Sequence, residues 1–133
     1  MPYTIQATNA VMAISEREYG TAQRIQFTQF TSCIGVLGVV NGEARGVHLS
    51  ISDQNQDLFD AQAVEQVVAL FPGAEQIKII GQIALWTNPD NRVSAAYDQM
   101  VQELNVAQDQ IYPMSDGVYG AEISEGELQL TFG

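Results

Sequence analysis

A predicted β-hairpin constrains the fold of this chain more than any other part of its sequence. Two runs, 33–40 and 44–51, are rich in β-branched and small residues, and Asn41-Gly42 lies between them. Asn-Gly is the strongest short-range hairpin signal, because both central residues of a type I′ turn need positive φ. We therefore expect the two runs to pair as antiparallel strands around a two-residue loop.

Side-chain parity in this hairpin places the only cysteine and the only histidine of the chain on one face. With a two-residue loop Cys33 pairs with Ser50, which makes His48 the diagonal neighbour of Cys33. Diagonal Cα atoms lie roughly 7–8 Å apart, so the thiol and the ring can touch. Gly35 and Gly46 share this face and predict open space, as in a pocket. The opposite face is predicted to be core and consists of Ile34, Val36, Val40, Val47, Leu49 and Ile51.

Length and charge narrow the function classes. The 133 residues fit a single domain over 1–133 that buries its own core. Five Lys and Arg against 16 Asp and Glu give a net charge of −11, which disfavours nucleic acid and anionic membranes as partners. The charge favours a basic protein partner or a solvated acidic surface. No run approaches the ~18 apolar residues of a membrane span and no signal peptide is recognisable, so we expect a cytoplasmic protein.

The remaining sequence predicts an α+β fold, a mainly antiparallel β-sheet or sandwich with two helices packed on it. Apolar residues at helical spacing indicate helices over about 58–71 and 92–104. Segment 10–19 has no clear pattern. Alternating or continuous apolar runs predict strands at 3–7, 23–31, 76–86, 110–113, 118–124 and 127–132.

A thiol beside an imidazole suits acyl transfer from an amide. As an ion pair, a thiolate attacks the carbonyl carbon, backbone N–H groups bind the oxyanion, and the imidazolium protonates the leaving amine. The structural alternative is a small buried Cys33 and a merely hydrogen-bonded His48. One cysteine and one histidine do not make a disulfide or a cysteine-based zinc site, and no metal or cofactor is expected. Hydroxyls that can orient the ring are those of Thr28, Thr31, Ser50 and Ser52.

At these residues the sequence resembles a known family. Residues 31–37 (TSCIGVL) resemble the L-G-S-C-V-A-V strand of the chemoreceptor glutamine deamidases of the CheD family, and residues 46–50 (GVHLS) resemble their G-x-A-H-x-M segment. The same hairpin core is shared by deamidating toxins of the cytotoxic necrotizing factor and Burkholderia lethal factor types. The resemblance implies a CheD-like fold, a nucleophile at Cys33, a base at His48, and hydrolysis of a protein glutamine side chain to glutamate and ammonia.

The chain departs from the family pattern before both motifs. The family's threonine lies six residues before the cysteine, where this chain has Phe27, so Thr28 becomes the expected third catalytic residue if a bulge restores the register. Phe30-Thr31 replaces the L-G pair, and Arg45-Gly46 replaces a doubled glycine. The other candidate orienting or pocket residues are Thr31, Ser32, Gly35, Gly46 and Ser50.

Two function classes remain after these considerations. The first is a deamidase of the chemotaxis or toxin-like type, whose substrate is a protein partner with an exposed glutamine. The alternative is a catalytically silent acidic binding module on the same fold, an adaptor or an inhibitor of a basic partner. A thiol protease is a weaker third option.

Overall fold

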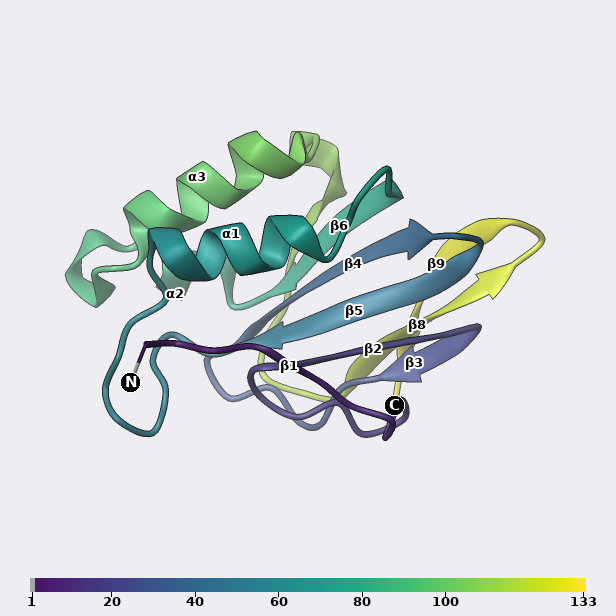
Figure 1. Cartoon of the computed structure of the whole chain (residues 1–133), viewed down its shortest axis with the longest axis horizontal. Coiled ribbons are helices and arrows are strands. Elements are labelled where there is room, and N and C mark those ends of the chain that lie inside the picture. The colour runs from purple at the N-terminus through teal and green to yellow at the C-terminus, as the bar shows by residue number, and fades with distance from the viewer. Residues whose placement is uncertain (1) are drawn as a thin grey trace.

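The computed structural model describes residues 2–133, so Met1, which the predicted domain includes, lies outside the described part. Three layers make up the α+β fold: helices, a six-stranded sheet and a three-stranded sheet (Figure 1). The larger sheet has the order β1-β2-β5-β4-β6-β7 and the smaller one β3-β8-β9. Pairing is antiparallel except between β1 and β2 and between β6 and β7.

The elements follow one another from strand-rich ends into a helical middle. The strands of the larger sheet are β1 (Gln6–Ala7), β2 (Glu18–Ala22), β4 (Ile34–Val40), β5 (Glu43–Leu49), β6 (Glu75–Gly81) and β7 (Ile111–Pro113). Those of the smaller sheet are β3 (Arg24–Gln26), β8 (Tyr119–Ser124) and β9 (Glu127–Phe132). The helices are α1 (Ala61–Ala69), α2 (Ile83–Thr87) and α3 (Ser94–Leu104), with 3₁₀ turns η1 (Pro89–Asn91) and η2 (Gln108–Gln110).

The central hairpin has the predicted register. Val40 pairs with Glu43 across the two-residue loop, and Gly35 pairs with His48. Asn41 and Gly42 have φ of 52° and 80°, the positive values that a type I′ turn demands. Cys33 lies one residue before β4, so His48 is its diagonal neighbour, as expected.

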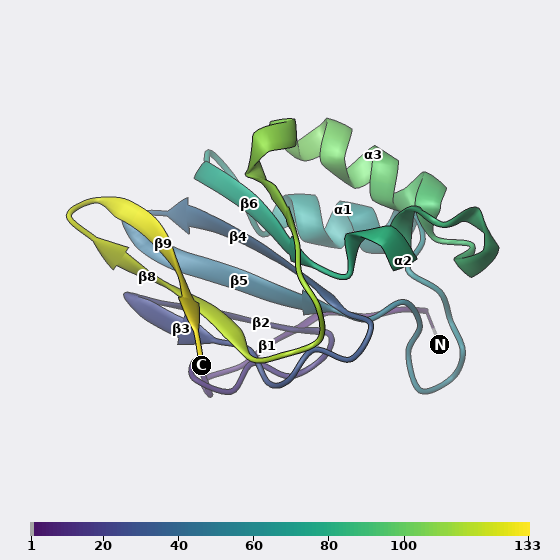
Figure 2. The same ribbon diagram turned by 180° about the vertical axis from the view of Figure 1, so that it is seen from behind.

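The two faces of this hairpin bury two separate cores. One core lies against α1 and α3, which pack together over the larger sheet. The other lies against the smaller sheet, whose strands β8 and β9 are seen in front of β5 in Figure 2. The predicted core face is confirmed, because Ile34, Val36, Val40, Val47 and Leu49 are buried in the helix-side core and Ile51 packs against it.

Two predicted strands extend too far, and one strand was not predicted. The expected strand over 76–86 ends at Gly81, whose φ of 123° turns the chain, and α2 takes up its last residues, so there are three α-helices in residues 2–133 rather than two. A short apolar run does not by itself distinguish a strand from a buried helix. The strand over 23–31 ends at Gln26, although the backbone N–H groups of Phe27 and Phe30 still bond to Tyr119 at the start of β8 and to Gly117 just before it. Finally, β2 overlaps none of the predicted strands.

No helix within residues 2–133 combines the length and the apolar character needed to cross a lipid bilayer.

The packing between the sheets predicts a cost for any side chain at Gly46. A Cβ there would lie 2.7 Å from Cδ1 of Ile25 and 2.8 Å from Cζ of Phe27. We expect Gly46→Ala to lower the free energy of unfolding by about 1–3 kcal/mol in chemical denaturation, because overpacking strains a filled core. Gly42→Asn is the control: Gly42 has no neighbour within 4 Å and Asn tolerates its positive φ, so a change within about 0.5 kcal/mol is expected. Equal stability of Gly46→Ala and wild type would contradict this packing.

Candidate functional site

Three segments that are distant in sequence bring the candidate site together. Cys33 precedes β4 and His48 lies near the end of β5. Strand β2 pairs with β5 so that Glu18 lies opposite His48, and the backbone N–H of Arg17 donates to the His48 carbonyl. This pairing holds Glu16 beside the thiol and the ring. One carboxylate oxygen of Glu16, the Cys33 Sγ and a ring nitrogen of His48 all lie within 4.8 Å of one another.

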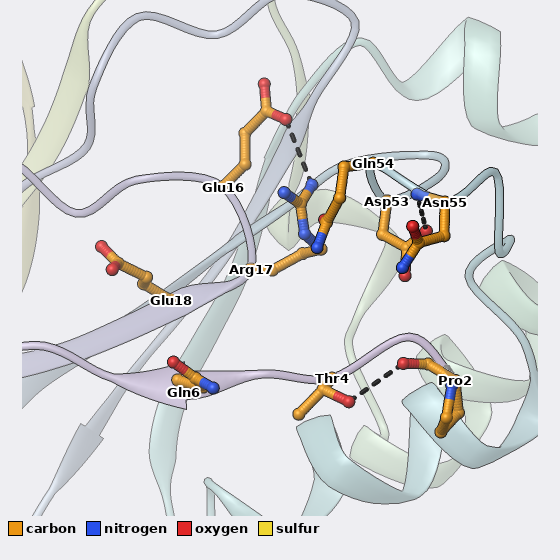
Figure 3. A pocket seen from close by; sticks show the side chains of 9 residues that line it. All are labelled: Pro2, Thr4, Gln6, Glu16, Arg17, Glu18, Asp53, Gln54 and Asn55. Atoms are coloured by element: carbon orange, nitrogen blue, oxygen red, sulfur yellow. Dashed lines mark hydrogen bonds and ion pairs between the residues drawn. The ribbon is translucent and has the colours of Figure 1, made fainter.

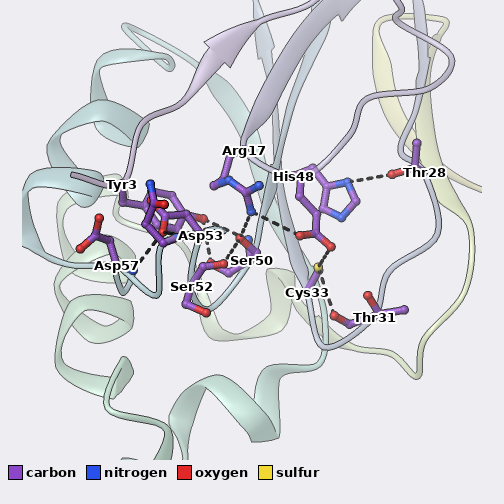
Figure 4. Close-up of polar contacts among 12 residues, drawn as sticks. Tyr3, Arg17, Thr28, Thr31, Cys33, His48, Ser50, Ser52, Asp53 and Asp57 are labelled. Atoms are coloured by element: carbon purple, nitrogen blue, oxygen red, sulfur yellow. Dashed lines mark hydrogen bonds and ion pairs between the residues drawn. The ribbon is translucent and has the colours of Figure 1, made fainter. Parts of the chain in front are cut away.

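The His48 ring is fixed by a backbone carbonyl. Its Nδ1 lies 2.9 Å from the carbonyl oxygen of Ile14, which only accepts, so Nδ1 carries the proton. Thr28 donates its backbone N–H to the same oxygen, and its Oγ1 lies 3.5 Å from Nδ1 (Figure 4). The other nitrogen, Nε2, is buried and has no hydrogen-bond partner within residues 2–133. The ring therefore presents an unused lone pair.

Cys33 is buried at 1% exposure, and its thiol has two acceptors. Its Sγ lies 3.4 Å from the carbonyl oxygen of Thr31 and 3.7 Å from Oε2 of Glu16, and either oxygen can accept its one proton. Figure 4 shows the Cys33 and His48 side chains on the same side of the sheet, next to each other. The predicted Cys–His proximity on one face is thus present, with a carboxylate added to it.

Glu16 connects the buried thiol with the surface. Its side chain is 39% exposed, and Oε1 lies 3.3 Å from Nη1 of Arg17. Arg17 in turn donates to Oγ of Ser50 at 2.7 Å, and Ser50 donates to the carbonyl of Ser52. Glu16 and Arg17 are among the residues that line a polar cleft of about 330 Å³ (Figure 3). Glu16 therefore both lines the cleft and contacts the Cys33 thiol.

Electrostatics favour a neutral pair in this arrangement. Burial raises the pKa of the Cys33 thiol to about 12, and the Glu16 carboxylate adds to that rise. Burial also lowers the pKa of His48, although its bond to the Ile14 carbonyl and the Glu16 charge oppose the change. Both pKa shifts act against the expected thiolate–imidazolium ion pair and favour a neutral thiol beside a neutral imidazole.

The other predicted site residues differ in what they reach. Thr28 approaches the ring as expected, but at 3.5 Å rather than the normal hydrogen-bond length, and through an irregular segment rather than a bulge. Thr31 contributes its carbonyl to the thiol. The exposed Ser32 has φ of 64°, donates its N–H to Asp116, and does not contact the ring.

The expected pocket beside the glycines is filled. A Cβ on Gly35 would lie 2.9 Å from the Phe27 ring and 3.0 Å from the Phe30 ring. The same rings lie 5.6 and 4.8 Å from the His48 ring, measured between centroids. Gly35 and Gly46 thus admit aromatic side chains from the segment after β3, and Glu16 is the member of the site that reaches the surface.

Sequence reasoning missed Glu16, Arg17 and the Ile14 carbonyl. All three lie in segment 10–19, which has neither helical nor strand periodicity. Their position depends on the pairing of β2 with β5, a contact between segments about thirty residues apart. A backbone carbonyl carries no residue-type signal at all.

In comparison with known proteins, no family model matches the sequence and no curated protein shows significant similarity to it.

The depressed pKa of His48 predicts how stability depends on pH. Just below the ordinary histidine pKa of about 6.5, the unfolded chain takes up a proton that folded His48 does not. This group's contribution therefore lowers the free energy of unfolding as pH falls from about 7 to about 5, by at most about 1.4 kcal/mol per pH unit. Chemical denaturation at several pH values in that range should show that the free energy of unfolding of His48→Gln falls less steeply with decreasing pH than that of wild type. Parallel curves for the two proteins would contradict the pKa shift.

The raised pKa of Cys33 predicts slow alkylation. With a pKa of about 12 rather than ~8.5, the folded protein at about pH 8 should react with iodoacetamide roughly a thousandfold more slowly than the denatured chain. The Glu16 carboxylate covers the thiol and raises its pKa. Glu16→Ala removes both effects, so alkylation of Cys33 should accelerate at least severalfold. Glu18→Ala changes the same charge nearby without touching Sγ and is the control. Equal rates for the two variants would show that Glu16 does not protect the thiol.

Proposed function

We propose that this chain is a protein-glutamine deamidase that acts in the cytoplasm on an exposed glutamine of a protein partner. The observation that carries the proposal is the state of His48: the Ile14 carbonyl holds the proton on Nδ1, Nε2 is left with a free lone pair, and a nitrogen of the same ring lies within 4.8 Å of the Cys33 thiol. A general base needs that tautomer and that proximity. The sequence resemblance to the CheD-like and toxin-type deamidases supports the same assignment.

The neutral pair sets the order of the acylation step. As Sγ of Cys33 attacks the side-chain carbonyl carbon of the substrate, its proton passes to Nε2 of His48, and the C=O electron pair moves to oxygen. Collapse of this tetrahedral intermediate expels the amide nitrogen, which takes the proton from Nε2 and leaves as ammonia. A thioester remains on Cys33.

Hydrolysis restores the starting state. Nε2 removes a proton from water as the water oxygen attacks the thioester carbon, and the thiolate leaves and recovers that proton. The product is a glutamate side chain. The hydrogen bond from Nδ1 to the Ile14 carbonyl persists through both steps and stabilises the ring whenever it carries a positive charge.

Glu16 indicates where the substrate would be placed. Its carboxylate is the same chemical group as the product of deamidation, and it lies 3.7 Å from Sγ while its other oxygen faces the Arg17 guanidinium. A substrate carboxamide that enters from the cleft would displace it. The Glu16 carboxylate would then occupy the position that the glutamate side chain of the product takes after the reaction.

This placement gives a test that requires no knowledge of the partner. Glu16→Gln puts a glutamine carboxamide beside the thiol, so the proposed activity should convert Gln at position 16 to Glu during incubation. Mass spectrometry of the peptide detects the replacement of NH₂ by OH and locates it by fragmentation. Since burial disfavours the thiolate, we expect conversion to accelerate as pH rises.

Two controls isolate the enzymatic conversion. The double variant Glu16→Gln, Cys33→Ser should keep its amide, and Glu18→Gln, a glutamine in the same cleft, should remain an amide at the spontaneous rate. If the carboxamide at position 16 is as stable with Cys33 as without it, the proposed function fails.

The burial of the pair favours a second candidate. Cys33 is 1% exposed and His48 is 0% exposed, as expected of core residues in the catalytically silent acidic binding module. The net charge of −11 suits a basic protein partner in that case. A stable carboxamide at position 16, together with alkylation of Cys33 that stays slow in Glu16→Ala, would favour this reading over the deamidase.

A further inference from the structure

We propose that Glu16, Cys33 and His48 form a zinc-binding site. Their carboxylate oxygen, Sγ and ring nitrogen lie within 4.8 Å of one another, and all three are ligand types that Zn²⁺ accepts. Sγ and Oε2 of Glu16 are 3.7 Å apart, close to the ~3.5 Å that a tetrahedral ion places between a sulfur ligand at ~2.3 Å and an oxygen ligand at ~2.0 Å. Spacing along the chain gave no sign of it, because the ligands come from three separate segments.

The histidine is already arranged as a metal ligand. Nε2 is buried and has no hydrogen-bond partner within residues 2–133, which is unusual for a polar atom in a protein interior. The opposite nitrogen donates its proton to the Ile14 carbonyl at 2.9 Å. Histidines that bind metals almost always donate the second ring N–H to a carbonyl or carboxylate, which fixes both tautomer and ring orientation. Nδ1 of His48 therefore already has the carbonyl partner that a metal-binding histidine needs, and Nε2 is free to bind the ion.

The carboxylate is supported in the same way. Arg17 contacts Oε1 of Glu16 at 3.3 Å and is itself held by Ser50, so Oε2 remains directed at the thiol. One thiolate and one carboxylate would neutralise the two charges of Zn²⁺. Binding replaces the S–H bond of Cys33 by an S–Zn bond and releases that proton to solvent. The ion can arrive through the polar cleft, which Glu16 lines, and water can supply a fourth ligand.

Zinc at this site would also regulate the proposed deamidase, and this consequence rests on the proposed function. The ion occupies both Sγ of Cys33 and Nε2 of His48, which are the nucleophile and the base of that reaction. Zinc would therefore inhibit it, while zinc binding itself requires no catalysis.

Cobalt provides the direct test, because Co²⁺ substitutes for Zn²⁺ and is coloured. Titration of the full chain with Co²⁺ should produce a thiolate-to-cobalt charge-transfer band with one ion per chain, and Zn²⁺ should displace it. Cys33→Ser should lose the band, and Glu16→Ala should weaken binding by about tenfold or more. Glu18→Ala, with the same loss of charge beside the site, should bind within about twofold of wild type. Circular dichroism confirms that each variant is folded.

The outcomes separate this proposal from the deamidase. Absence of the charge-transfer band in the folded wild type, or a band that survives Cys33→Ser, would overturn the zinc site and leave the conversion of Glu16→Gln untouched. Equal weakening by Glu16→Ala and Glu18→Ala would also overturn it, because charge alone would then account for affinity. A band that depends on Cys33 and Glu16 supports the site even if the carboxamide at position 16 is stable. Glu16→Ala is used here because the glutamine variant is a substrate under the proposed function.

Discussion

The hydrogen bond from Nδ1 of the buried His48 ring to the carbonyl oxygen of Ile14 is the interaction on which the rest of the site depends. The same oxygen accepts the backbone N–H of Thr28, so a single acceptor ties the segment before β2, the segment after β3 and strand β5 together. An unsatisfied polar group in a protein interior costs about 1–3 kcal/mol, which makes this three-way junction expensive to break. It also determines which nitrogen of His48 is free, and the chemistry of the site follows from that.

Local sequence patterns were sufficient for the central hairpin. The Asn41-Gly42 turn and the alternation of the pleat fix register and face together, so the proximity of Cys33 and His48 could be inferred without any tertiary information. The sequence was a weaker guide to the position of Thr28 beside the ring, because the chain between Thr28 and Cys33 is irregular. Glu16 could not be inferred, since its position depends on the long-range pairing of β2 with β5 rather than on any pattern within its own segment.

A glycine on a strand leaves space beside the backbone where another residue would place its side chain. The sequence alone does not show what fills that space. At Gly35 and Gly46 the absence of a Cβ was compatible with a pocket or with close packing of another layer. Phe27 and Phe30 decide in favour of packing, because the smaller sheet covers this face and brings both rings against His48. The hydrophobic cover excludes water from the ring and lowers its pKa, whereas Glu16, which contacts the thiol, also lines the polar cleft.

The unused lone pair on Nε2 is the feature of the packing on which both proposals depend. An aliphatic or aromatic side chain at position 48 would fill a dry interior without leaving a polar atom unsatisfied, so a purely structural core has no need of this arrangement. The thiol at 1% exposure is similarly poised, because burial keeps its proton in place until something stabilises the thiolate. Both proposals use the free lone pair on Nε2 and the protonated thiol together. In the deamidase Nε2 would accept the thiol proton during attack, and in the zinc site the ion would bind Nε2 and the thiolate. The two proposals differ in the fate of the Glu16 carboxylate beside Sγ: a substrate of the proposed deamidase would displace it, whereas a zinc ion would use it as a ligand.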